Sequence, residues 1–441
     1  MNWFTVAGVL TQLQDYFIIN DSQAGLLQTM FIVCYMLFAP VFGYFGDRYN
    51  RRYILSVGLF VWIISVLSSS LVGRENFGLF MLCRAVVGVG EASYSTVAPT
   101  IIADMFTGRS RSISLMIFYF AIPVGSGLGY MVASFISAWT GSWQWGIRVT
   151  PLFGFVCLLL IVFVMEHVER GQAEHAHFGK SSFLEDVYYL FSIRTYLFAT
   201  AGFTFVVFVV GSVSWWVPSL LGHSWALHHG TRHVPGGVTA EISLVFGLIT
   251  CLAGLCGVAF GSSLAQMWRR GNSYLRKSDS ADCLVCAVGA IIAVPMLFFA
   301  IVLSRDYITL CWIFIFLGVT GSCLNWAVNM DLVMKIVLPN RRSTANAIQT
   351  LTSHLMGDAS SPYIIGLISD ALKGDDASTV TQYYALQRAL FVPNFVLIGA
   401  GAFYLIASYY VAADEKKAED LMHMPIIIEN GNDTAPLINT E

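Results

Sequence analysis

Long apolar stretches, separated by short polar segments, dominate the chain. A helix that crosses the hydrocarbon core of a bilayer needs about 20 mostly apolar residues. Eleven stretches satisfy this requirement, and no comparable run of alternating strand-like residues stands beside them. The pattern predicts an all-α integral membrane protein with about 11 full spans, at residues 24–45, 53–72, 77–102, 112–138, 147–166, 195–220, 241–262, 283–303, 307–337, 344–372 and 382–412.

The basic residues between the spans test this count, because cytosolic loops carry an excess of lysine and arginine. If successive loops alternate sides, 17 basic residues fall on one side and five on the other. We therefore expect the first side, together with both chain ends, to be cytosolic. Its basic residues are Arg48, Arg51, Arg52, Arg109, Arg111, Arg170, Lys180, Arg194, Arg269, Arg270, Arg276, Lys277, Lys335, Arg341, Arg342, Lys416 and Lys417, and those of the other side are Arg74, Arg148, Arg232, Arg305 and Lys373.

The composition also indicates that much of the chain lies in a lipid bilayer, and it excludes several functions. Of 441 residues, 56% are hydrophobic and 12% charged, about half the charge of a soluble domain. The net charge of −3 argues against a nucleic-acid partner. Most of the nine cysteines lie inside apolar runs, and Cys283 and Cys286 form a lone C-x-x-C, so no metal site is expected. The glycine clusters lack a Walker lysine, so we expect no cofactor, no ATP site and no enzyme activity.

The longest predicted cytosolic connection divides the chain near its middle. The predicted parts are an N-terminal helical half (1–166), a linker (167–194), a C-terminal helical half (195–412) and a cytosolic tail (413–441). Within the linker, Phe183, Val187, Leu190 and Phe191 share one helical face, which is typical of a surface helix, although a plain linker fits as well. Two six-helix halves joined by a polar linker form the major facilitator fold, whose substrate site lies between the halves.

The most specific local motif lies between the first two full spans. The segment Gly43-Tyr44-Phe45-Gly46-Asp47-Arg48-Tyr49-Asn50-Arg51-Arg52 matches the superfamily signature G-x-x-x-D-R-x-x-R-[RK] at every fixed position. The aspartate can meet a helix N-terminus, and the arginines can pair across the cytosolic helix ends. The resemblance to the superfamily implies that the segment is a gate that closes the cytosolic side. The alternative is a solvated basic loop. The corresponding segment of the second half, 261–270, keeps the glycine and arginines but lacks the aspartate.

Ionisable residues inside predicted spans are the candidates for the substrate site, since each costs about 2.5–3.5 kcal/mol at the bilayer centre. Arg84 and Glu91 lie seven residues apart, nearly on one helical face. Asp331 lies in a later span, and His354 and Asp358 follow at i, i+4. One interpretation is a central cavity with a titratable carboxylate and a cation for an anionic headgroup. The alternative is structural pairing between helices.

Several blocks resemble the spinster family of the major facilitator superfamily. They comprise residues 24–32, 84–130 and 339–370, and Asn325-Trp326-Ala327 with Asp331. The family exports lysolipids, including lysophospholipids and sphingosine 1-phosphate, and some members are thought to be proton-linked. The resemblance implies that Arg84 binds the headgroup or couples transport and that Glu91 titrates. Ser93, Tyr94 and Ser95 would line the cavity, to which Asn325 adds a further polar side chain.

The start of the chain departs from that family. Members carry a first-helix segment resembling N-Y-M-D-R-[FY]-T-x-A-G-V-L, whereas this sequence begins Met1-Asn2-Trp3-Phe4-Thr5, with Asn2 at the place of the aspartate. Residues 1–12 therefore resemble the end of a first helix whose beginning is absent, in a truncated isoform or a gene model with a wrong start. From this we expect weak or absent proton dependence in the chain as written.

The C-terminal tail contributes a candidate sorting signal. Asp433, Leu437 and Ile438 fit the acidic dileucine pattern D-x-x-x-L-I, which a cytosolic adaptor protein could bind. We therefore favour the late endosomal or lysosomal membrane, with the plasma membrane as the alternative. The predicted function is secondary-active transport of a lysolipid or sphingolipid by alternating access. The alternatives are a facilitator of a polar solute, such as a sugar or organic anion, or a transport-defective isoform.

Overall fold

The computed structural model describes residues 2–105, 108–165, 183–231, 234–271, 277–338, 341–374 and 378–423, and every regular element in these ranges is a helix. The elements are α1 (Asn2–Thr5), the 3-10 turn η1 (Ala7–Val9), α2 (Leu10–Phe17), α3 (Asp21–Arg48), α4 (Arg51–Ser69), α5 (Phe77–Met105), α6 (Gly108–Thr140), α7 (Trp143–Phe163), α8 (Phe183–Ser192), α9 (Arg194–His228), α10 (Gly236–Arg270), α11 (Ala281–Leu303), α12 (Ile308–Cys323), α13 (Asn325–Ile336), α14 (Arg342–Ser353), the π-helical turn η3 (His354–Asp358), α15 (Ser361–Lys373), α16 (Thr379–Ala389) and α17 (Phe391–His423).

Within the described residues, nine helical stretches are long and apolar enough to cross a membrane. Each overlaps one predicted span, so the prediction of an all-α membrane protein is confirmed. The two remaining predicted spans, 112–138 and 344–372, correspond to α6 and to the succession α14, η3 and α15. Hydropathy locates these elements because a bilayer demands apolar side chains and internally satisfied backbones over about 20 residues.

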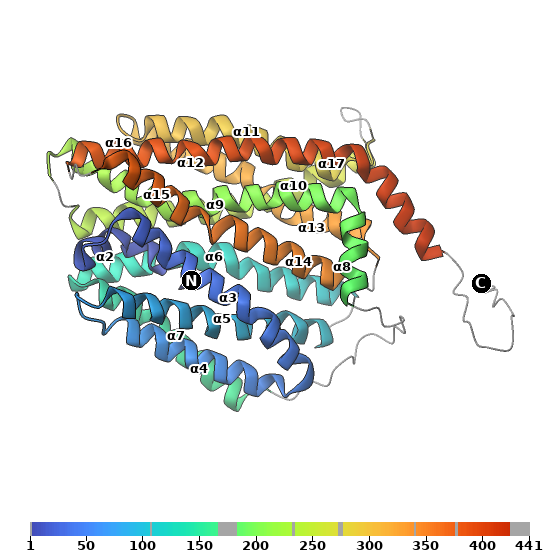
Figure 1. Ribbon diagram of the computed structural model, residues 1–441, viewed down its shortest axis with the longest axis horizontal. Coiled ribbons are helices and arrows are strands. Elements are labelled where there is room, and N and C mark those ends of the chain that lie inside the picture. The colour runs from blue at the N-terminus through green and yellow to red at the C-terminus, as the bar shows by residue number, and fades with distance from the viewer. Residues whose placement is uncertain are drawn as a thin grey trace, which may run out of the picture.

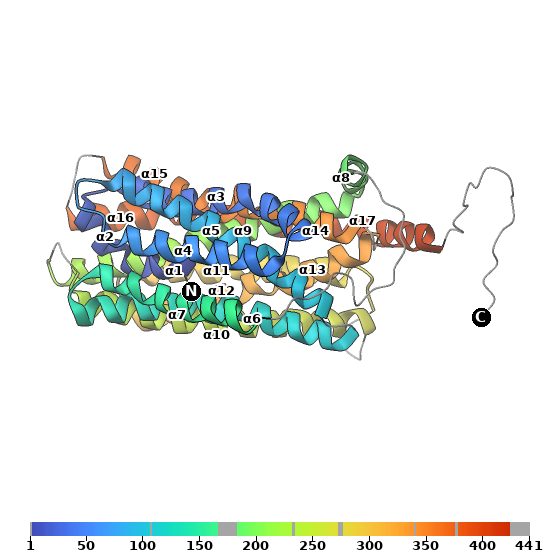
Figure 2. The ribbon, with the colours of Figure 1, turned by 90° about the horizontal axis from the view of Figure 1, so that it is seen from below.

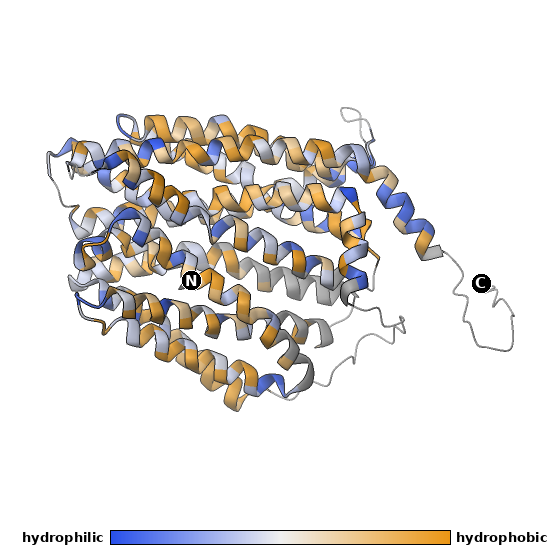
Figure 3. Ribbon diagram, viewed as in Figure 1, coloured by the Kyte–Doolittle hydropathy of each residue, from blue (hydrophilic) through white to orange (hydrophobic). Residues whose placement is uncertain are grey.

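The long helices run side by side along the longest axis of the molecule, with successive helices in opposite directions (Figures 1 and 2). Orange, hydrophobic ribbon covers the central part of these helices, and blue residues gather towards the two ends (Figure 3). We call the end at which α3 meets α4 the basic end, since Arg51 and Arg52 begin α4 there. The opposite end, where Asp21 begins α3, is the Asp21 end.

Helix boundaries follow from local chemistry. Asn20 caps α3 in a reciprocal capping box, in which its side chain accepts from the Gln23 backbone N–H and the Gln23 side chain accepts from the Asn20 N–H. Helices α16 and α17 are interrupted at Leu390, three residues before Pro393. Proline has no N–H to donate and its ring crowds the preceding turn, so a break in the helix is expected before it.

The short helix α8 runs across the basic end, roughly perpendicular to the bundle (Figure 1).

Two helix pairs join the segment before α8 to the segment after it. Helix α3 packs against α15, and α6 packs against α10. The second contact is a close crossing of two glycines, because a Cβ atom on Gly127 would lie 2.6 Å from the carbonyl oxygen of Gly247. Near it, the Tyr130 ring meets the Phe246 ring edge to face at 5.2 Å. Small residues permit such approach where lipid supplies no hydrophobic driving force between helices.

Candidate functional site

Arg84 is a buried cation in the apolar helix α5, about two turns after its start at Phe77. Only 2% of the residue is exposed, and its guanidinium carbon lies 4.8 Å from the centre of the Phe31 ring on α3. Within the described part of the chain, its Nε and Nη2 atoms have no hydrogen-bond partner. An unsatisfied buried cation is costly, so Arg84 is suited to bind an anionic group that enters the protein.

Glu91 lies two turns along the same helix and is 8% exposed. The Tyr94 side chain forms a hydrogen bond with its carboxyl group, and Arg84 attracts it electrostatically. The Ser95 hydroxyl donates to the backbone carbonyl of Glu91 at 2.9 Å. Helix α5 therefore holds a cation, a carboxyl group and a tyrosine hydroxyl within a few turns of one another.

Two glycines bring α5 against its neighbours at this level. A Cβ atom on Gly88 would lie 2.2 Å from the carbonyl oxygen of Phe31, and one on Gly90 would lie 2.8 Å from the backbone nitrogen of Trp62. Because the obstructing atoms belong to the backbone, a larger side chain at either position would push the helices apart. Gly88 thus allows the close approach of α5 to α3, the helix whose Phe31 ring lies beneath the Arg84 guanidinium.

The Ser93 side chain packs against helix α4. It is fully buried, and a Cβ atom on Gly58 of α4 would overlap its hydroxyl, so Ser93 lies in the contact between α4 and α5. Its hydroxyl donates to the Gly90 carbonyl at 2.8 Å. Of the three predicted lining residues, Tyr94 is the one whose side chain meets the Glu91 carboxyl group.

His354 and Asp358 form a second titratable pair at the π-helical turn η3. His354 Nδ1 and Asp358 Oδ2 are 3.0 Å apart, and their side chains are 22% and 15% exposed. Single π turns recur at functional sites, because they break the regular hydrogen-bond ladder of the helix. Helix α3 contacts both sites: Phe31 stacks on Arg84, and the Thr29 hydroxyl donates to the Ala359 carbonyl, directly after η3.

Asn325 and Asp331 lie on α13, which packs against α9, α10, α11 and α17. Asn325 is fully buried, donates to the Ser322 carbonyl at 3.2 Å and lies beside Gly289 of α11. Asp331 lies near the basic end, with 54% of its side chain exposed and 3.7 Å from Arg269. The structure therefore places these two residues among the C-terminal helices rather than beside Arg84.

A carboxylate that sequence reasoning missed sits at the same basic end. Asp282, in the first turn of α11, is 2% exposed, lies 3.1 Å from Arg269 Nε and accepts a hydrogen bond from Lys335. It supplies the negative charge that segment 261–270 lacks, but from the following helix. The sequence did contain a signal for Asp282: it stands at the start of an apolar span and follows Arg269 and Arg270 by about a dozen residues.

The signature segment is described in part. The Arg52 guanidinium donates to the Val162 carbonyl at the end of α7, and Arg51 is buried. The surroundings of Gly43 and the side chains of Asp47 and Arg48 are not described, and the tail residues Asp433, Leu437 and Ile438 lie outside the described residues.

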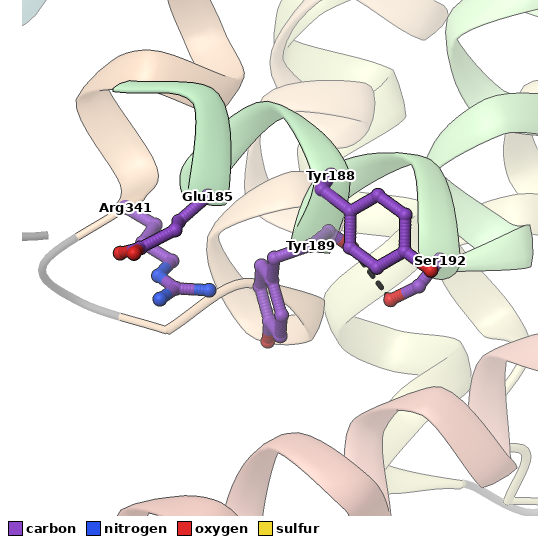
Figure 4. A pocket seen from close by; sticks show the side chains of 5 residues that line it. All are labelled: Glu185, Tyr188, Tyr189, Ser192 and Arg341. Atoms are coloured by element: carbon purple, nitrogen blue, oxygen red, sulfur yellow. Dashed lines mark hydrogen bonds between the residues drawn. The ribbon is translucent and has the colours of Figure 1, made fainter. Parts of the chain in front are cut away.

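A pocket of about 530 Å³ lies on α8 and is lined by Glu185, Tyr188, Tyr189, Ser192 and Arg341 (Figure 4). Its arginine is already engaged, since Arg341 Nε lies 3.0 Å from Asp186 and the guanidinium carbon lies 4.6 Å from the Tyr189 ring centre. Burial raises the pKa of the Tyr189 hydroxyl, which keeps it protonated and neutral. The pocket is a junction between α8 and the start of α14, and none of the predicted substrate-site residues lines it.

Comparison with known proteins identifies the family. The model of the Major Facilitator Superfamily matches residues 1–361. Protein spinster homolog 1 of Xenopus laevis is 44% identical over 424 residues, which cover 95% of this chain and 80% of that protein. The sphingosine-1-phosphate transporter SPNS2 of Xenopus tropicalis is 42% identical over 421 residues, with coverage of 95% and 80%.

Among solved structures, the fold matches a bacterial homolog of the human lysosomal transporter spinster in an inward-facing, unoccupied conformation. The TM-score is 0.78 at 19% identity, and the match covers 94% of each chain. The helical bundle, the match to the superfamily model and the relatives that align over 95% of the chain all indicate the same family. The chain belongs to the spinster family of the Major Facilitator Superfamily and is a membrane transporter, not an enzyme.

Proposed function

We propose that this transporter moves a single-chain lipid with an anionic headgroup, a lysophospholipid or a sphingosine phosphate, by alternating access. The observation that carries the proposal is Arg84, a buried guanidinium whose Nε and Nη2 atoms have no hydrogen-bond partner among the described residues. A phosphate group would accept hydrogen bonds from both atoms and neutralise the charge. The relative named as a sphingosine-1-phosphate transporter supports the same class of substrate.

The surroundings of Arg84 favour an amphipathic ligand over a sugar. Its guanidinium lies over the Phe31 ring, and its neighbours on the same face of α5, Phe80 and Val87, are both buried and apolar. A sugar site needs several amide and hydroxyl groups arranged to match the hydroxyls of its ligand. One cation within an apolar wall instead matches a charged headgroup that is followed by an alkyl chain.

Glu91 and the pair His354–Asp358 are the groups that we propose for proton coupling. Glu91 lies on the same helix as Arg84, so protonation of its carboxyl group would strengthen the pull of Arg84 on an incoming anion. A proton on His354 would be stabilised by Asp358, whose Oδ2 lies 3.0 Å from His354 Nδ1. Glu91 and Arg84 belong to the proposed N-terminal half, 1–166, and His354 and Asp358 belong to the proposed C-terminal half, 195–412.

The proposed orientation places the basic end in the cytosol, as the distribution of lysine and arginine favours. The tail 413–441 would then be cytosolic, where an adaptor could bind Asp433, Leu437 and Ile438. Residence in late endosomes or lysosomes is part of the proposal. The signature residues Gly43, Asp47, Arg48, Arg51 and Arg52 would close the cytosolic side.

The test is transport by Arg84→Ala in proteoliposomes with sphingosine 1-phosphate and with a lysophospholipid. We expect the rate to fall to the background of protein-free vesicles for both lipids, because the variant lacks the only charge proposed for the headgroup. Arg148→Ala is the control: Arg148 bonds to Ser70 at 2.9 Å near the Asp21 end and should tolerate the change. A wild-type rate from correctly inserted Arg84→Ala protein would contradict the headgroup role.

A further inference from the structure

Gln28 on α3 is a buried amide that the candidate site has not yet accounted for. The residue is 3% exposed, and its Oε1 atom has no hydrogen-bond partner among the described residues. A buried acceptor without a donor is costly, and such atoms are rare in folded proteins. The amide oxygen of Gln28 is therefore suited to a donor that a ligand supplies.

The contact between α3 and α5 sets the depth of Gln28 in the bundle. Successive long helices run in opposite directions, so α3 and α5, with α4 between them in sequence, run the same way (Figures 1 and 2). A Cβ atom on Gly88 of α5 would lie 2.2 Å from the Phe31 carbonyl oxygen of α3. One turn before Phe31 is Gln28, and one turn before Gly88 is Arg84. Gln28 and Arg84 therefore lie at the same level.

The helical wheel of α3 directs Gln28 into the protein. Each residue advances about 100° around a helix, so Gln28 lies about 60° from Phe31 on one side and about 60° from Gly25 on the other. Phe31 meets α5, whereas a Cβ atom on Gly25 would lie 2.3 Å from the Pro362 carbonyl oxygen of α15. Leu37, about 180° around the helix from Gln28, is 65% exposed. Gln28 thus lies between α5, which carries Arg84, and α15, which follows η3.

The two proposed classes of substrate share one hydrogen-bond donor beside the phosphate. In sphingosine phosphate, the second carbon from the phosphate ester oxygen carries an ammonium group. In a 1-acyl lysophospholipid, the corresponding carbon carries a free hydroxyl group. An amide oxygen can accept a hydrogen bond from either group. A phospholipid with two acyl chains has an ester at that carbon and offers no donor there.

We propose that Gln28 is a specificity-determining residue of this transporter, whose Oε1 accepts a hydrogen bond from the donor on the second carbon of the lipid while Arg84 binds the phosphate. The inference rests on the proposed function and adds a second contact to the same headgroup. A lipid without the donor leaves the buried amide oxygen unsatisfied, and a site built around such a hydrogen bond rejects the analogue that lacks it. Gln28 therefore selects single-chain lipids that keep a free amine or hydroxyl next to the phosphate.

The test compares lysophosphatidic acid with its 2-deoxy analogue, which has hydrogen in place of the hydroxyl group. Initial rates of the full chain in proteoliposomes give kcat/KM for each lipid. We expect the unmodified chain to prefer lysophosphatidic acid by about tenfold, equivalent to ~1.4 kcal/mol. Gln28→Met has a similar length but no amide and should transport both lipids equally, and Gln28→Leu serves if the methionine variant fails to insert. Gln28→Glu keeps an acceptor oxygen and should keep the preference.

Thr29→Val is the matched control on the same helix. The Thr29 hydroxyl donates to the Ala359 carbonyl, a contact within the protein, so its loss should change both rates in proportion and leave the preference intact. An equal preference in the unmodified chain and in Gln28→Met would overturn the proposal, even if Arg84→Ala abolished transport of both lipids. Conversely, normal transport by Arg84→Ala would contradict the headgroup role of Arg84, whereas a preference lost in Gln28→Met would still assign the donor contact to Gln28.

Discussion

Arg84 and Glu91 differ in how the protein satisfies their charges. The carboxyl group of Glu91 is engaged by Tyr94, whereas Arg84 offers two guanidinium nitrogens without a described hydrogen-bond partner. The proposed headgroup role of Arg84 needs this asymmetry, because a cation already saturated by protein would not exchange its partner for a headgroup. The aromatic face of Phe31 offsets part of the cost of leaving Arg84 uncompensated.

Glu91→Gln should separate substrate binding from coupling. Glutamine preserves shape and hydrogen bonding but cannot titrate, so we expect transport to persist and the weak dependence of the unmodified chain on lumenal pH to disappear. The measurement is lysolipid flux in proteoliposomes over an imposed pH range. Tyr94→Phe, which removes the hydroxyl that bonds to Glu91 and leaves the carboxyl group intact, is the comparison and should shift the profile without flattening it. A Glu91→Gln profile that matched wild type would assign coupling elsewhere.

At the scale of helices, glycines and polar side chains replace the hydrophobic effect as the source of specificity. Lipid is as apolar as leucine, so helices associate through close packing and interhelical hydrogen bonds. One such network is fully buried among the C-terminal helices: Tyr404 donates to Asn329 at 3.1 Å, Asn329 to Gln349 at 2.9 Å and Gln349 to Thr200 at 3.1 Å. It connects α17, α13, α14 and α9, and Gln349 is on the helix that leads into η3.

Gly88→Leu should destabilise the contact between α3 and α5. The added side chain would meet the Phe31 backbone carbonyl, which cannot move aside as a flexible side chain would. Overpacking of this kind costs about 1–3 kcal/mol, so the thermal transition of the purified protein should fall. Gly78→Ala on the same helix is the control, because its Cβ atom would meet nothing within 4 Å. Equal transitions for the two variants would contradict the packing argument.

At the scale of the whole molecule, α3 connects the candidate site with the C-terminal helices. It contacts Arg84 through Phe31, the residue after the turn η3 through Thr29, and α15 through Asp21. A tilt of α3 would therefore change the surroundings of Arg84, of η3 and of the start of α3 together. Asp282, Arg269 and Lys335 lie within the C-terminal helices and hold that group together at the basic end.

The proposed sorting signal, Asp433, Leu437 and Ile438, lies outside the described residues. If the tail signal operates, Leu437→Ala combined with Ile438→Ala should move the transporter from lysosomes to the plasma membrane, because the adaptor loses its apolar contacts. Fluorescence microscopy with a lysosomal marker measures the redistribution. Asn439→Ala, next to the motif, is the control. Continued lysosomal residence of the double variant would leave the dileucine interpretation unsupported.

The lipid bilayer requires each span to be apolar along its own length, and a requirement on one continuous segment can be read from the sequence alone. A span must be apolar along its own length, so hydropathy located the helices, and the cost of an intramembrane charge singled out Arg84, Glu91 and His354. The signature segment and the blocks shared with the spinster family were likewise contiguous. None of these inferences needed to know which helices are neighbours.

Partners and facing directions were decided only by the tertiary structure. Asp21 and Asp370 are separated by 349 residues, and no local pattern joins them. Ser93 and Tyr94 are adjacent in sequence, yet packing against Gly58 turns one towards α4 while the other meets Glu91. Asp282 compensates for the aspartate absent from segment 261–270 because α10, α11 and α13 converge at the basic end. These contacts depend on how glycines let helices cross, which hydropathy along a single helix does not encode.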